Sequence, residues 1–187
     1  MTREFRRLIA PEDVGAVAGW IGARLRADWG FTRAYDGAAD ALLIDAFDDA
    51  DAGRALAVDD DRFEAVFVER TLDRIAALQH GMIRLTRPAN ILVIGSDAYL
   101  GRWDGVAQAA ASAAIVGVVR SLAMEHAPAQ WRVNMLALPL GTRPDDAALI
   151  AHAAAQASVL LTTRSITGTT VLIDDGNNLK FRQARRR

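Results

Sequence analysis

Short apolar runs alternate along the chain with longer segments in which apolar residues recur every three or four positions. The apolar runs are bounded by glycine, proline or acidic residues, and they have the length and composition of buried strands. They predict strands over 5–10, 41–47, 90–96, 131–141 and 168–176.

The segments between these runs have the spacing of helices. Pro11 suits a first helical turn and Gly30 a helix end, so one helix is expected between them. Further helices are expected over 60–85, 106–127 and 143–163. Strand and helix therefore alternate, which predicts an α/β fold whose parallel sheet is covered by helices on both faces.

Length and composition fit a single globular domain, which we place at 1–180, before a basic tail at 181–187. The hydrophobic content of 51% and net charge of −1 argue against nucleic-acid binding. The chain has no cysteine, and its three histidines have no metal-ligand spacing, so no metal is expected.

The N-terminal stretch MTREFRRLIAPEDV lacks the apolar core of a signal peptide, so we expect a cytoplasmic protein. The apolar run from Val106 to Val119 is too short and too rich in alanine for a membrane span. It predicts a buried helix instead, and no contact with a membrane.

Four segments occur in an order that matches a known family: DALLIDAF, ILVIGS, IVGVVRSLAMEHAPAQWRVNMLALP and SITGTTVLIDDGNNL. With them, residues 41–179 resemble the short-chain dehydrogenases/reductases, which move hydride between a nicotinamide and an alcohol or ketone. The segments correspond to the strand ending in Asn-Asn-Ala-Gly, the strand ending in the catalytic serine, the active-site helix with the next strand, and the closing segment. The resemblance implies a Rossmann-like three-layer sandwich.

The family's catalytic residues do not carry over. Ser96 matches the catalytic serine, but the positions of the catalytic tyrosine and lysine hold Gln108 and Ser112. The fourth position, an asparagine in the family, falls near Glu69 or Arg70. Because neither glutamine nor serine relays a proton near neutral pH, we expect these positions to be vestigial and the chain to be no enzyme.

No shifted alignment restores the pair. The chain has two tyrosines, Tyr35 and Tyr99, and its single lysine, Lys180, is close to neither in sequence. A lone serine at a strand end, such as Ser96, is more often structural than nucleophilic.

The dinucleotide site is expected to be lost as well. In the resemblance Gly19 is one surviving glycine of the phosphate-binding turn, while Asp13 and Val17 replace the others. Glu12 and Asp13 fall where phosphate would sit, and would repel it. The glycines at 15, 19 and 22 lie inside the predicted helix and are interpreted as packing glycines. No cofactor is therefore expected to bind this chain.

The chain is also shorter than the family. Residues 11–40 suffice for one helix between the first two strands, where the family has further strand–helix units. In the family order 3-2-1-4-5-6-7 this removes strands 2 and 3, so we expect a sheet equivalent to 1-4-5-6-7. The segment after LPLGT is too short for the family's substrate lid.

What remains corresponds to the parts through which the family's tetramers assemble, here 62–85, 105–127, 145–161 and 169–174. A standard contact would bury about 800 Å² per partner. The residues expected in the contact are those of the 105–127 helix: Ala109, Ala113, Val116, Gly117, Val119, Arg120, Leu122 and Ala123.

The resemblance therefore implies a non-catalytic subunit in a hetero-oligomer, expected to be a tetramer. An active short-chain dehydrogenase partner would bind NAD(P) and oxidise a hydroxyacyl-CoA-type alcohol. Two alternatives stay open. One is an enzyme with new chemistry at Ser96, Asp97, Tyr99 and Arg102, which predicts a pocket where these groups hydrogen-bond one another. The other is a stand-alone homo-oligomer that binds a ligand or regulates.

Overall fold

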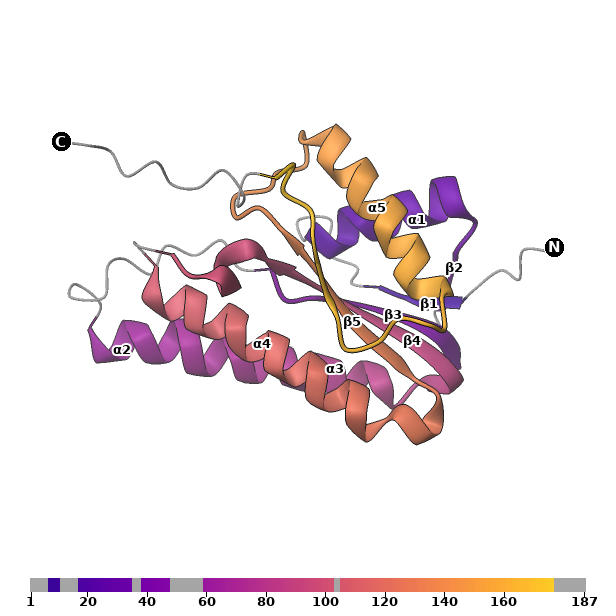
Figure 1. The fold of residues 1–187 in the computed structure, drawn as a ribbon, viewed down its shortest axis with the longest axis horizontal. Coiled ribbons are helices and arrows are strands. Elements are labelled where there is room, and N and C mark those ends of the chain that lie inside the picture. Colours follow the sequence, from indigo (N-terminus) through magenta and orange to yellow (C-terminus); the bar gives the residue numbers. More distant parts are fainter. Residues whose placement is uncertain (1–6, 11–16, 35–37, 48–58, 103–104, 177–187) are drawn as a thin grey trace.

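The computed structural model describes residues 7–10, 17–34, 38–47, 59–102 and 105–176 (Figure 1). Their strands form one parallel sheet of six in the order β2-β1-β3-β4-β5-β6. The bounds are β1 (Arg7–Ile9), β2 (Thr32–Arg33), β3 (Ala39–Asp45), β4 (Leu85–Ser96), β5 (Arg132–Leu138) and β6 (Thr170–Leu172). The predicted fold class is confirmed.

Helices cover both faces of the sheet and make three layers (Figure 1). One face carries α1 and α5, and the other carries α3 and α4. The helical segments are α1 (Val17–Trp29), α2 (Asp60–Phe63), a π-helix (Glu64–Glu69), α3 (Arg70–Met82), α4 (Val106–Glu125) and α5 (Ala147–Thr162), with 3-10 turns at Asp97–Leu100 and Ala127–Ala129.

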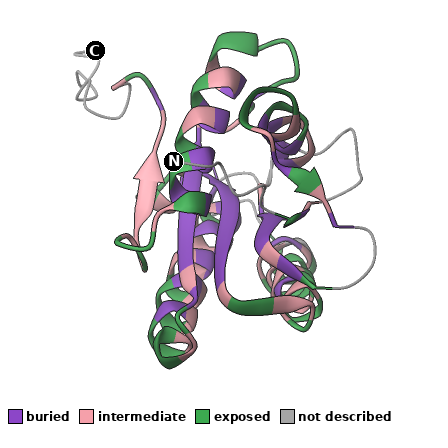
Figure 2. Cartoon of the chain, turned by 90° about the vertical axis from the view of Figure 1, so that its right-hand side faces the viewer, coloured by how far each residue is buried: buried purple, intermediate pink, exposed green. Residues whose placement is uncertain are grey.

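Alternation of side chains along the strands builds two hydrophobic cores, one on each face. In β3, Ala41 and Leu43 belong to the core with α1 and α5, whereas Leu42 and Ile44 belong to the core with α3 and α4. Figure 2 shows the sheet buried between helices whose outer sides are exposed. This two-sided burial explains why the central strands read as continuous apolar runs.

The sheet has one strand more than the sequence predicted. β2 pairs in parallel with β1, with Arg7 opposite Thr32. This is the place of strand 2 in the family order, so the predicted order 1-4-5-6-7 is wrong at this edge. A two-residue strand has no periodicity to detect. The buried side chains of Phe31 and Ala34 flank it, and the Ala34 N–H donates to the carbonyl of Leu8 at 2.9 Å.

The predicted 60–85 helix is interrupted by the π-helix between α2 and α3. Val66 of the π-helix is buried against Ala107 of α4, together with Phe63 and Phe67. The two phenyl rings lie 5.4 Å apart between centroids. The turns on either side of the π-helix keep helical spacing, so the sequence predicts one continuous helix over this segment.

By length and composition, α4 is the one described helix that could cross a membrane. It packs instead on β4 and β5 of its own sheet (Figure 1). Its buried residues recur at helical spacing along that side: Ala107, Gln108, Ala111, Ser112, Ile115, Val119 and Ala123. The prediction of a helix buried on the sheet is confirmed.

Candidate functional site

The positions that match the family's catalytic serine and lysine meet at the carboxyl end of β4. Ser96 is its last residue, and its Oγ lies 3.2 Å from the Oγ of Ser112, so the two hydroxyls share a hydrogen bond. Ser96 and Ser112 are 1% and 4% exposed. The hydroxyls therefore satisfy each other inside the protein.

Gln108 lies one helical turn before Ser112 on the same buried side of α4 and is 2% exposed. Its amide oxygen lies beside Gly105, where an added Cβ would be 3.2 Å away. A carboxamide and two hydroxyls titrate nowhere near neutral pH. They are therefore not groups that act as a general acid and base at neutral pH.

The position that matches the family's asparagine lies elsewhere. Glu69 ends the π-helix and Arg70 begins α3, and both are exposed. Of the four positions that match the family's catalytic residues, the structure buries Ser96, Gln108 and Ser112 near the end of β4. Arg70 lies outside this group.

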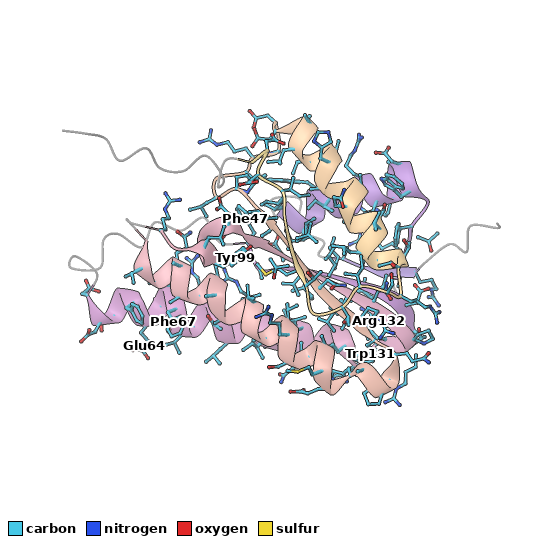
Figure 3. All side chains as sticks on the ribbon, viewed as in Figure 1. Phe47, Glu64, Phe67, Tyr99, Trp131 and Arg132 are labelled. Atoms are coloured by element: carbon cyan, nitrogen blue, oxygen red, sulfur yellow. The ribbon has the colours of Figure 1, made fainter. Side chains whose placement is uncertain are left out.

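Tyr99 is the one tyrosine in the described residues, and it lies in the 3-10 turn after β4 (Figure 3). Burial, and then the carboxylates of Asp97 and Asp174, raise its pKa above the ordinary value. A catalytic phenol needs the opposite shift, which the family obtains from a nearby lysine. Tyr99 therefore stays protonated at neutral pH and is a poor proton acceptor.

Two of the four residues considered for new chemistry have hydrogen-bond partners outside that group. Ser96 bonds to Ser112, and Asp97 accepts the backbone N–H of Leu140 at 3.0 Å. Arg102 is exposed at the surface. The two hydrogen bonds hold the end of β4 against α4 and the turn after β4 against the segment that follows β5.

The start of α1 holds a feature that sequence analysis missed. The Oδ2 of Asp45, the last residue of β3, accepts the backbone N–H of Ala18 at 2.8 Å. Its Oδ1 accepts the backbone N–H of Phe47, also at 2.8 Å. The sequence does contain a signal for these hydrogen bonds. Asp45 ends a buried strand and replaces an asparagine of Asn-Asn-Ala-Gly. The predicted Glu12 and Asp13 lie outside the described residues.

Two other residues of α1 bear on the dinucleotide turn. Val17 is 5% exposed and belongs to the core, so its side chain is bulk where the family has a glycine. A Cβ on Gly22 would lie 3.3 Å from the Cβ of Ala10, so Gly22 lets α1 approach the sheet closely. The interpretation of Gly22 as a packing glycine is confirmed.

The outer side of α4 carries part of the predicted contact surface. Ala113, Gly117 and Arg120 are exposed, while Ala109, Val116 and Leu122 are half-buried. A Cβ on Gly117 would have no atom within 4 Å. Large apolar side chains are also exposed on α3, α4 and the π-helix: Val68, Leu72, Val106 and Met124.

Two residues must be removed from that predicted surface. Val119 is 0% exposed and Ala123 is 4% exposed, because both side chains pack into the core against the sheet. Neither is available to a partner, so the prediction is wrong for these two. α4 is apolar on nearly every side, so its sequence could not show which side faces outward.

A cavity of about 430 Å³ lies between α5 and the edge strand β6. His152 and Gln156 line it from α5, and residues 171–176 line it from β6 and the turn beyond. Asp174 is buried there and accepts the N–H of Gly176 at 3.0 Å. Within the described ranges, no group of three or more acidic, histidine or cysteine side chains could hold a metal.

Comparison with known proteins supports the fold. No protein-family model and no curated protein matches the chain. Among solved structures it is similar to a putative oxidoreductase from Escherichia coli K-12, with TM-score 0.75, 18% identity, and coverage of 96% of this chain and 100% of that one. A short chain dehydrogenase family protein from Francisella tularensis gives TM-score 0.74, 16% identity, and 95% and 100% coverage.

A short chain dehydrogenase from Burkholderia cenocepacia, solved in complex with NADP, gives TM-score 0.69 and 21% identity, over 93% of this chain and 98% of that one. At such identities the likeness concerns the fold. The chain therefore has the Rossmann-like fold of the short-chain dehydrogenases, as the sequence motifs implied.

Proposed function

We propose that the chain is a non-catalytic subunit that assembles with an active short-chain dehydrogenase and stabilises it. The observation that carries the proposal is the Ser96–Ser112 hydrogen bond, with Gln108 buried beside it on α4. Groups that cannot transfer protons fill the positions where the fold's enzymes have their tyrosine and lysine. The protein's contribution then comes through its surfaces.

The outer surface of α4 supports association. It combines small exposed residues, which allow close approach of another backbone, with exposed apolar side chains on the same side of the sheet. β6 and the cavity beside α5 provide a second candidate contact at the sheet edge. Binding to the folded partner stabilises it by mass action.

In the proposed complex the partner, rather than this chain, binds NAD(P) and oxidises a hydroxyacyl-CoA-type alcohol. We propose a complex of the kind of 2-[hydroxy(phenyl)methyl]succinyl-CoA dehydrogenase of anaerobic toluene degradation, which joins an active and an inactive subunit. Ketoacyl reductases with an unequal partner are a second example. We propose a heterotetramer in the cytoplasm.

The test is a matched pair of substitutions, Ala113→Arg on α4 and Ala23→Arg on α1. Both alanines are exposed on helices, but they lie on opposite faces of the sheet. Each variant is co-expressed with a short-chain dehydrogenase from the same genome that carries Tyr-x-x-x-Lys, beginning with one encoded next to this chain. We measure complex formation, and the unfolding temperature and turnover of the partner.

We expect Ala113→Arg to weaken association by about 1.4 kcal/mol or more, a factor of ten, while Ala23→Arg leaves it unchanged. Both variants should unfold at the wild-type temperature, because exposed positions tolerate substitution. Equal association of the two variants would contradict the proposed surface. A stable homo-oligomer that leaves every partner's stability unchanged would favour the stand-alone alternative.

A further inference from the structure

The start of α1 is where a Rossmann-type protein receives the pyrophosphate of a dinucleotide, on free backbone N–H groups. We propose that in this chain the carboxylate of Asp45 takes the place of that phosphate and closes the site to dinucleotides. The inference deepens the proposed function, since it accounts for a subunit that uses no cofactor, but it can be tested without a partner.

The hydrogen bonds of Asp45 are the first argument. The N–H of Ala18, in the first turn of α1 as described, is already donated to Asp45 Oδ2 at 2.8 Å. The other oxygen accepts the N–H of Phe47 at 2.8 Å, which fixes the carboxylate across the end of β3. A charged acceptor at a helix start is favoured by the helix dipole, as a phosphate would be.

The space around the helix start is the second argument. Val17 contributes a buried side chain where the fold's enzymes bring bare backbone to the pyrophosphate. Phe47 stands where they have the glycine of Asn-Asn-Ala-Gly, and it packs against the same core as Val17 (Figure 3). Both positions therefore carry a side chain where the fold's enzymes have glycine.

Charge is the third argument. The strand ends that face a dinucleotide in this fold carry Asp45 as the last residue of β3, Asp97 after β4 and Asp174 after β6. Each carboxylate accepts a backbone N–H of a neighbouring segment, from Ala18, Leu140 and Gly176 respectively. Hydrogen bonds to these three carboxylates hold the segments at the carboxyl ends of the strands. Their negative charges repel an anionic ligand. The residues present do not fit a dinucleotide.

The experiment compares Asp45→Ala with Asp40→Ala in the full chain. Asp40 lies at the opposite end of β3, where its carboxylate also accepts one backbone N–H, from Arg7 at 2.9 Å. Asp45→Asn is a third variant that keeps the side-chain shape. Thermal unfolding is measured with and without inorganic pyrophosphate at constant ionic strength. NADPH fluorescence is titrated with each protein.

We expect the wild type to give no saturable NADPH signal and no shift with pyrophosphate. Asp45→Ala should unfold about 2–4 °C lower, because the helix start loses its acceptor. Pyrophosphate should recover part of that loss, by binding the exposed N–H groups. Asp40→Ala should show no recovery. If Asp45→Ala does not fold, Asp45→Asn should show a smaller loss with partial recovery.

Two results would overturn the inference. One is saturable NADPH binding by the wild type. The other is that pyrophosphate shifts the unfolding temperature of the folded Asp45 variant no more than it shifts that of Asp40→Ala. Either result concerns the helix start alone, so the association measured with Ala113→Arg would stand or fall separately.

Discussion

At the level of single residues, Ser96 and Ser112 satisfy each other's hydroxyls where solvent cannot reach. Ser112→Ala should destabilise the fold by about 1–3 kcal/mol, because it leaves the Ser96 hydroxyl buried without this partner. Adding Ser96→Ala should cost less than the sum of the two single changes. Urea unfolding of the four proteins measures the coupling. Additive losses would show that the hydroxyls do not interact.

Tyr99 offers a second test at this scale, because its pKa is raised by burial and by two aspartates. In a Tyr35→Phe variant Tyr99 is the only tyrosine, and its absorbance change at alkaline pH should have a midpoint above the ordinary value of about 10. The neutral phenol is favoured in the fold, so its contribution to stability is complete below pH 10 and is lost as pH rises through the folded pKa.

Asp97→Asn in the same background should move that midpoint down toward 10, since it removes one of the carboxylates that raise the pKa of Tyr99. A midpoint below 10 in the Tyr35→Phe protein would mean that a positive charge reaches the phenol. That result would reopen the hypothesis of new chemistry at this position.

At the scale of elements, Asn90 connects β4 to the end of α5. Its side-chain amide donates to the carbonyls of Leu160 at 3.1 Å and Thr163 at 2.8 Å, and it is 2% exposed. Asn90→Leu should destabilise the protein by about 1–3 kcal/mol, because helix-end carbonyls lose their donor. Gln156→Leu, on the exposed side of α5, should change stability by less than about 0.5 kcal/mol. Equal effects in chemical denaturation would contradict this role.

Elements with strong patterns could be predicted from the sequence, and weak ones could not. The central strands and α4 read clearly because long apolar runs are needed to fill both cores. β2 and the π-helix were missed for a physical reason. Two residues carry no periodicity, and helical spacing on both sides of the π-helix makes the whole segment read as one helix.

At the scale of the whole molecule, positions set by a single strand or helix can be read from the sequence. Contacts between segments far apart in the chain cannot. Ser96, Gln108 and Ser112 are buried at the end of β4 and on one side of α4, positions that strand and helix periodicity determine. The bond from Asp45 to Ala18 joins residues 27 positions apart. Val119 and Ala123 were assigned outward because an all-apolar helix does not reveal its orientation.

Asp45 and Val17 also bear on whether such a chain could regain dinucleotide binding. Returning a glycine at Val17 alone would remove a side chain from the core, and removing Asp45 alone would leave the first turn of α1 without its acceptor. Each of these substitutions alone would lower the free energy of unfolding, with no bound ligand to compensate. Proteins of marginal stability tolerate few such losses. We therefore expect folding stability itself to oppose single substitutions toward dinucleotide binding.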